Sequence, residues 1–156
     1  MRALLVGLLV LGVAAVLGGD HDSPLWPLAG RFHPLLVHLP IGMLVLAAVA
    51  EGIGRAPSRS QWRALVSPAL LIGAWSAIAA GLAGLLLADW GSYDPALLIW
   101  HKRLGVLIAP LATLAWWLRE RAATGDARAH RLYLALAGGL VLALVVTVVL
   151  VTAPER

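Results

Sequence analysis

Five stretches of this chain are apolar and almost free of charge, and each is about as long as a lipid bilayer is thick. They are residues 3–19, 34–50, 64–88, 95–118 and 132–153. A helix needs about 20 residues to cross the hydrocarbon core, with roughly 17 to 25 tolerated. Because a backbone in lipid must satisfy its own hydrogen bonds, such stretches are expected to be helical. The sequence therefore predicts an all-α membrane protein, with an N-terminal transmembrane helix followed by a four-helix transmembrane bundle.

The composition excludes several functional classes. The chain is 61% hydrophobic and 13% charged, whereas soluble domains are about half apolar and about a quarter charged. It contains no cysteine, which excludes disulfides, thiolate metal sites and covalent attachment of c-type haem. No interleaved aromatic and basic tract suggests a nucleic-acid partner. Lipid is the expected surrounding, and any cofactor must be held by nitrogen or oxygen ligands.

Two units are expected along the chain. Residues 1–30 form the N-terminal transmembrane helix and an outer loop, and residues 31–156 form the four-helix membrane bundle. The first stretch also resembles a signal peptide, since Arg2 precedes an apolar core that contains small residues. We interpret it as a retained transmembrane anchor.

Basic residues are distributed unequally between the two predicted sides of the membrane. One side carries Arg2, Arg55, Arg59, Arg63, Arg119, Arg121, Arg128 and Arg131, and the other carries Arg31, Lys102, Arg103 and Arg156. Loops rich in arginine and lysine stay in the cytoplasm. We therefore expect a multi-pass protein of the bacterial inner membrane, with a cytoplasmic N-terminus and a periplasmic C-terminus. Glu51 is expected to pair with Arg55 or Arg63 at the cytoplasmic end.

His38 and His101 are the candidate functional residues. Each lies in a predicted membrane segment near the outer face, where ionisable side chains are rare and usually functional. Gly42 and Gly105 follow them by four residues and so share their helix faces. A missing side chain lets a bulky ligand approach the backbone closely. The pattern indicates a flat ligand held between the second and fourth segments.

The ligand that fits this pattern is one b haem with His38 and His101 as axial ligands. A bis-histidine site leaves no open coordination position, which suits electron transfer. His33 lies some 140° around the helix from His38 at 3.6 residues per turn, and we expect it to hydrogen-bond a haem propionate. Lys102 and Arg103 lie near the level of the propionates, although they could equally snorkel to lipid headgroups.

Two simpler interpretations of the histidines stay open. A bare copper or zinc ion would need a third and a fourth ligand, and His33 is poorly placed to be one. Alternatively, each histidine is an interfacial residue that bonds a neighbouring carbonyl or a lipid headgroup.

Two runs of the sequence resemble a bacterial family known as domain of unknown function 2231. They are His33-Pro34-Leu35-Leu36-Val37-His38-Leu39-Pro40-Ile41-Gly42, with Glu51 downstream, and Trp100-His101-Lys102-Arg103-Leu104-Gly105. Family members carry an HPxxVHxPI run and a later WHxxLG run, and the resemblance covers residues 32–152. The domain often occurs with c-type cytochrome or Rieske-like modules, which implies a redox role. Members resemble four-helix cytochrome b scaffolds, in which haem sits between diagonal helices.

We therefore expect a membrane b-type cytochrome subunit with one haem near the periplasmic face, which passes electrons within a respiratory or photosynthetic complex. Such a chain is no enzyme alone but the electron-transfer subunit of an oxidoreductase complex. The resemblance implies partner subunits, a c-type cytochrome or Rieske-like protein among them, with quinone as a further candidate. The alternative is a cofactor-free structural or assembly subunit. A small transporter would need a polar path, which the third and fifth stretches scarcely offer.

Overall fold

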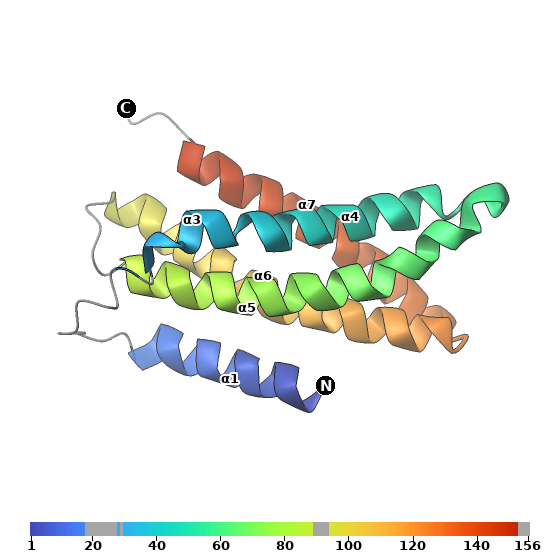
Figure 1. Cartoon of the computed structure of the whole chain (residues 1–156), viewed down its shortest axis with the longest axis horizontal. Coiled ribbons are helices and arrows are strands. Elements are labelled where there is room, and N and C mark those ends of the chain that lie inside the picture. Colours follow the sequence, from blue (N-terminus) through green and yellow to red (C-terminus); the bar gives the residue numbers. More distant parts are fainter. Residues whose placement is uncertain (18–27, 29, 89–93, 153–156) are drawn as a thin grey trace.

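The computed structural model describes residues 1–17, 28, 30–88 and 94–152. This part of the chain is helical throughout and contains no strand (Figure 1). The elements are α1 (Arg2–Leu17), α3 (His33–Leu36), α4 (His38–Ile53), the 3-10 segment η1 (Pro57–Leu65), α5 (Val66–Ala88), α6 (Pro95–Ala123) and α7 (Ala127–Thr152). The all-α membrane fold predicted from the sequence is confirmed. Most of the predicted outer loop, residues 18–27, and Arg156 fall outside the described residues.

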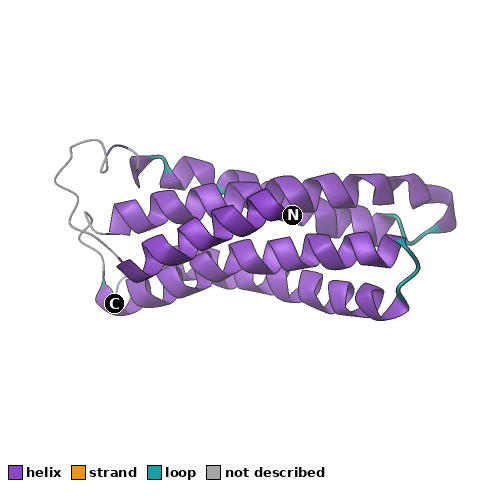
Figure 2. Ribbon diagram, turned by 90° about the horizontal axis from the view of Figure 1, so that it is seen from below, coloured by secondary structure: helices purple, strands orange, loops and turns teal. Residues whose placement is uncertain are grey.

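Four described segments are long and apolar enough to cross a membrane. They are His33–Ile53, Pro57–Ala88, Pro95–Ala123 and Ala127–Val149. In the bundle, α4 packs on α5, α5 on α6, and α6 on α7, while α7 returns to α4 only sparsely (Figures 1 and 2). As a result α4 and α6 lie diagonally across the bundle.

The N-terminal helix α1 lies outside the bundle against α5 and α6 (Figure 1). It buries Leu4 and Leu11, and Leu11 fills the space beside Gly81 of α5. With 16 residues, α1 is about 24 Å long at a rise of 1.5 Å per residue. The described helix is therefore shorter than the hydrocarbon core of roughly 30 Å.

Prolines set the local geometry of the segments that carry the histidines. Pro40 has no N–H to donate to the carbonyl of Leu36, and the helix is interrupted for one residue at Val37, which nevertheless keeps helical angles. Consequently α3 and α4 continue one another along nearly one axis. At the start of α6, Pro95 occupies the first turn, and the Asp94 carboxylate accepts a hydrogen bond from the Leu97 N–H at 2.9 Å.

Small side chains bring the helices close together. Ala109, Ala112 and Ala115 of α6 are fully buried, and α5 contributes several more buried alanines. Membrane helices depend on such residues because lipid leaves no hydrophobic drive for association. Gly73 of α5 packs closely against α4, since a Cβ built there would lie 3.0 Å from Leu44 Cδ2.

We predict that Gly73→Val lowers the free energy of unfolding by about 1–3 kcal/mol, because its added carbons must enter space held by Leu44. Gly138→Val on α7 is the matched control, since Gly138 is exposed and a Cβ there meets no atom within 4 Å. Thermal unfolding in detergent measures both. An equal loss in the two variants would contradict the described packing of α4 on α5.

Candidate functional site

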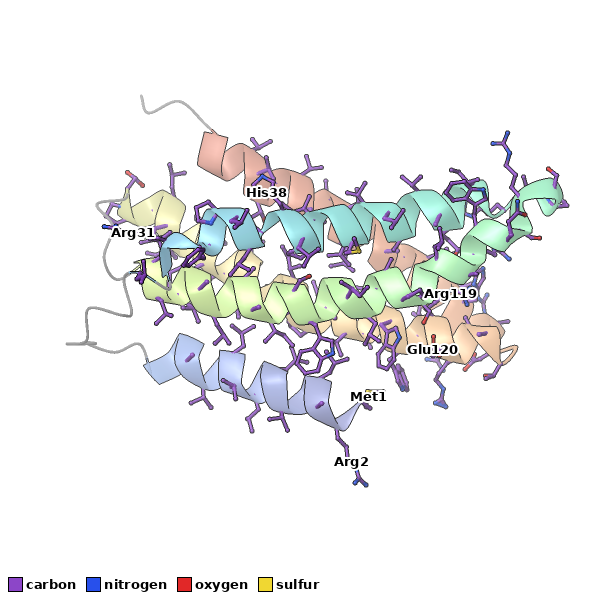
Figure 3. All side chains as sticks on the ribbon, in the orientation of Figure 1. Met1, Arg2, Arg31, His38, Arg119 and Glu120 are labelled. Carbon is purple, nitrogen blue, oxygen red and sulfur yellow. The ribbon has the colours of Figure 1, made fainter. Side chains whose placement is uncertain are left out.

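Polar groups gather at the two ends of the bundle. Figure 3 shows His38 towards the end where Arg31 lies, and Arg119 and Glu120 towards the opposite end. We call these the histidine end and the arginine end. Among the described residues, the buried side-chain atoms without a hydrogen-bond partner also fall at these ends: His101 Nδ1 at the first, and atoms of Glu51, Arg63, Arg119 and Tyr133 at the second. Buried polar atoms without a hydrogen bond are uncommon and mark places where a water or an ion can bind.

His33 and His101 lie side by side at the histidine end. Their ring centroids are 6.1 Å apart, and the ring planes are inclined at 86°. His33 is half-buried on α3, and its Nδ1–H donates a hydrogen bond of 2.9 Å to the carbonyl of Ala80. Because a carbonyl only accepts, this bond fixes the proton on Nδ1 and leaves the lone pair on Nε2.

The position of the His33 ring depends on Gly84 of α5. A Cβ built on Gly84 would lie 2.7 Å from His33 Cε1 and 2.9 Å from its Nδ1. No larger residue fits there unless the ring moves. His101 is half-buried on α6, and the backbone of Thr147 on α7 lies near its ring. The pair is thus enclosed by α5 on one side and approached by α7 on the other.

His38 lies apart from this pair. Its ring is exposed, and its Nδ1–H donates a 2.6 Å hydrogen bond to the carbonyl of Pro34, one turn earlier. The structure therefore brings His33, rather than the expected His38, beside His101. The reason is rotational, because His33 and His38 point in directions some 140° apart on one nearly continuous helix.

The other predicted site residues lie on α4 and α6, the helices that carry His38 and His101. Gly42 is exposed and Gly105 half-buried, and a Cβ on either would meet no atom within 4 Å. Lys102 is half-buried, and the guanidinium of Arg103 lies 5.5 Å from the centroid of the Trp100 ring. Both glycines thus border open space, while Arg103 makes a cation–π contact.

The imidazoles of His33 and His101 are the metal-binding groups that lie close together at this end. Among the described residues, no group of three or more histidine, aspartate or glutamate side chains is close enough to hold a metal ion. A bare zinc ion normally takes four ligands. The histidine pair therefore suits a group that brings further ligands of its own.

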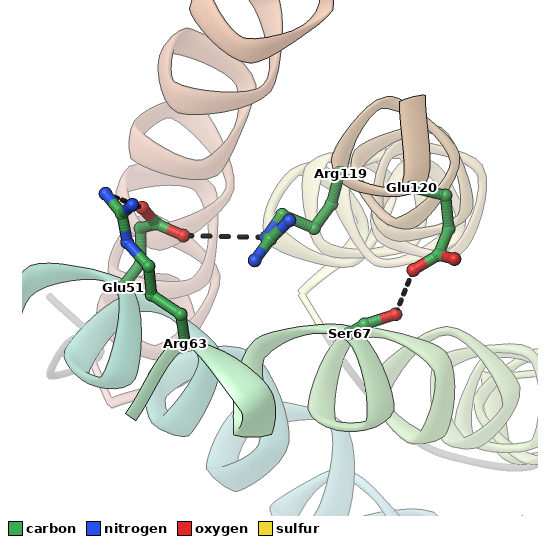
Figure 4. A network of polar contacts seen from close by, with 5 residues as sticks. All are labelled: Glu51, Arg63, Ser67, Arg119 and Glu120. Carbon is green, nitrogen blue, oxygen red and sulfur yellow. Dashed lines mark hydrogen bonds and ion pairs between the residues drawn. The ribbon is translucent and has the colours of Figure 1, made fainter. Parts of the chain in front are cut away.

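The arginine end is built around a buried carboxylate (Figure 4). Glu51 is 4% exposed, and its oxygens lie 3.4 Å from Arg63 Nη2 and 3.7 Å from Arg119 Nε. The fully buried Tyr133 of α7 has its hydroxyl near this carboxylate. The sequence anticipated Arg63 as a partner, but it missed Arg119 and Tyr133, which come from α6 and α7.

A glycine also shapes this end. A Cβ built on Gly54 would lie 2.6 Å from Arg63 Cγ. Because Gly54 has no Cβ, the Arg63 side chain passes close to the end of α4 and reaches back to Glu51. Gly54 and Gly84 therefore have the same role at opposite ends of the bundle, because each makes room for one polar side chain.

We predict that Glu51→Gln lowers the free energy of unfolding by about 2 kcal/mol, because two guanidiniums lose their buried counter-ion; the loss is smaller than for a fully buried pair, since Arg63 is partly exposed. Glu120→Gln is the control. Glu120 is exposed at the same end and accepts a hydrogen bond from Ser67, so less than about 1 kcal/mol should be lost. Thermal unfolding in detergent compares the two, and a larger loss for Glu120→Gln would refute the central position of Glu51.

Comparison with known proteins places most of the chain in one family. Residues 30–152 match the family described as "Predicted membrane protein (DUF2231)". No curated protein and no solved structure matches the chain.

Proposed function

This chain belongs to the DUF2231 family of membrane proteins, and from the geometry of its histidine end we propose that it is the haem-carrying subunit of a membrane electron-transfer complex. The proposal assigns it one b haem and no catalytic activity of its own. Its partners would be other subunits of the complex, with a c-type cytochrome or Rieske-like protein, or quinone, exchanging electrons with it.

The observation that supports this most is the 6.1 Å separation of the His33 and His101 ring centroids. Two imidazoles that bind one metal from opposite sides have centroids roughly 6 Å apart, because metal–nitrogen bonds are about 2 Å long. No third side-chain ligand stands near them in the described part of the chain. A porphyrin supplies the remaining ligands itself, which favours haem over a bare ion.

The chain's own residues would hold and orient the iron ligands. The Nδ1–H of His33 is committed to Ala80, which leaves Nε2 as the nitrogen that would bind the metal and would make the imidazole a better donor. His101 would be the second ligand, and Gly105, one turn further along α6, borders open space. The sequence alone favours His38 as the partner of His101, and its Nε2 is likewise free, so His38 is the alternative ligand.

When bound, a bis-histidine haem supplies a one-electron couple without an open coordination position. Because the chain has no cysteine, the haem would be held without covalent attachment. Lys102 would lie within reach of a propionate, whereas Arg103 is engaged by Trp100.

The orientation in the membrane is part of the proposal. The arginine end faces the cytoplasm of a bacterial cell, and the histidine end faces the periplasm. With α1 as a fifth crossing, the N-terminus is cytoplasmic and the C-terminus periplasmic. Electrons would then be exchanged at the periplasmic face.

A cofactor-free structural subunit is the second candidate function, and one observation favours it. His33 already bonds Ala80 and fills the space beside Gly84. These contacts hold α3 against α5 without any cofactor, as those of an interfacial histidine would. An optical spectrum distinguishes the two functions, because only the first requires a chromophore.

We predict that the purified chain carries about one haem, with a low-spin bis-imidazole spectrum. His33→Ala and His101→Ala should each abolish this spectrum, whereas His38→Ala should retain it as the matched control. A pyridine haemochrome assay gives the stoichiometry. If His38→Ala loses the haem and His33→Ala keeps it, the ligands are those that the sequence favours. If the chain carries no haem when it is expressed in haem-replete cells, the haem proposal is refuted and the structural function remains.

For the orientation, we predict that a cysteine at Ala96 reacts with a membrane-impermeant maleimide in intact cells, whereas one at Ser58 reacts only after lysis. Both positions are exposed at opposite ends of the bundle, and no native cysteine interferes. The reverse pattern of labelling would invert the proposed topology.

A further inference from the structure

The two arginines around Glu51 have unused hydrogen-bonding capacity. Their ion-pair distances of 3.4 and 3.7 Å exceed the roughly 2.7–2.9 Å of a charge-assisted hydrogen bond. The Nε atoms of Arg63 and Arg119 are buried and lack a hydrogen-bond partner. Each guanidinium carries several donors, and the Nε–H of each is the one that is buried without a hydrogen bond among the described residues.

The charge at this end is also unbalanced. Two guanidiniums share the one carboxylate of Glu51, which leaves an excess positive charge (Figure 4). Glu120 follows Arg119 in sequence, but its carboxylate turns to the Ser67 hydroxyl. Arg55 is a further cation close enough to influence Tyr133. An anion is therefore attracted to this end of the bundle.

The two arginines lie where the apolar segments end and are accessible from outside. Arg63 is 42% exposed on η1, and Arg119 is 17% exposed near the end of α6. The exposed Trp62 precedes Arg63, and tryptophans mark the headgroup level of membranes. Lipid phosphates occupy this depth, and basic pockets between helices bind them.

We propose that Arg63 and Arg119 together bind a phosphate group, and that Glu51 holds the two guanidiniums in position for it. Phosphate oxygens match the planar fork of arginine better than any neutral acceptor. The group could come from a lipid headgroup or from free phosphate. This site lies at the opposite end from the histidines and does not depend on the proposed haem.

The test measures the thermal midpoint of the full chain, purified in neutral detergent and depleted of lipid. The probes are phosphatidylglycerol, diacylglycerol with the same acyl chains, and inorganic phosphate against chloride at equal ionic strength. Ligands that bind the folded state raise its thermal midpoint. A rise in the midpoint with phosphatidylglycerol alone therefore supports a lipid phosphate. A rise with inorganic phosphate supports free phosphate as the source. Equal rises with phosphatidylglycerol and diacylglycerol, or no rise at all, overturn the proposal.

Variants locate the site. Arg63→Gln and Arg119→Gln should each weaken binding of the active probe roughly tenfold to a hundredfold, as expected for the loss of one charge-assisted hydrogen bond. Arg128→Gln removes the same charge from an exposed position at the same end and should change binding less than threefold.

Loss of one arginine beside Glu51 could prevent the chain from folding. Variants that keep the positive charge are therefore needed as well. Arg63→Lys and Arg119→Lys retain a cation opposite Glu51 but lose the planar fork, so they should weaken binding in the same direction. An effect of Arg128→Gln equal to that of the Arg63 and Arg119 variants would refute the assigned residues.

Discussion

The need to pair every polar group inside hydrocarbon governs this structure. A lone polar group costs several kcal/mol in lipid because no water replaces the missing partner. The chain meets most of this demand locally, since the hydroxyls of Ser76, Thr113 and Thr147 bond carbonyls one turn earlier, as does the His38 ring. Among the described residues, the buried side-chain atoms without a hydrogen bond belong to His101 and to Glu51 with its neighbours Arg63, Arg119 and Tyr133. To these two places we assign the proposed haem and the proposed phosphate.

Small residues make these polar contacts possible as well as the close packing of helices. Gly84 makes room for an imidazole and Gly54 for an arginine stem, so the polar contacts of His33 and Arg63 each depend on a side chain that is absent. A helix surface without Cβ atoms also exposes carbonyls, and His33 uses one of them on the same turn of α5. Close packing and polar contacts therefore both depend on small residues.

The sequence predicts the helices well, because length and hydropathy determine which segments cross a bilayer. It predicts less well which side of a helix faces inward, since lipid-facing and core-facing surfaces are both apolar. The choice between His33 and His38 depends on that rotation, and the depth of a residue along the helix does not reveal it. Arg119 was missed for another reason. We expected the fourth segment to end at residue 118, but α6 continues to Ala123 and carries Arg119 back to Glu51. The role of Gly84 beside His33 could not be predicted, because α5 contains many small residues and the sequence does not distinguish Gly84 from the others.

Each helix of the bundle packs chiefly on the one before it, and α7 meets α4 only sparsely. Chains enter the membrane from the N-terminus onwards, so α3, α5 and α6 can bring His33 and His101 together before α7 arrives. The last helix then covers His101 with the backbone around Thr147 and, through Tyr133, completes the surroundings of Glu51. In the proposed haem protein, this order of insertion would leave the histidine pair uncovered until α7 arrives, and the haem would enter during that interval.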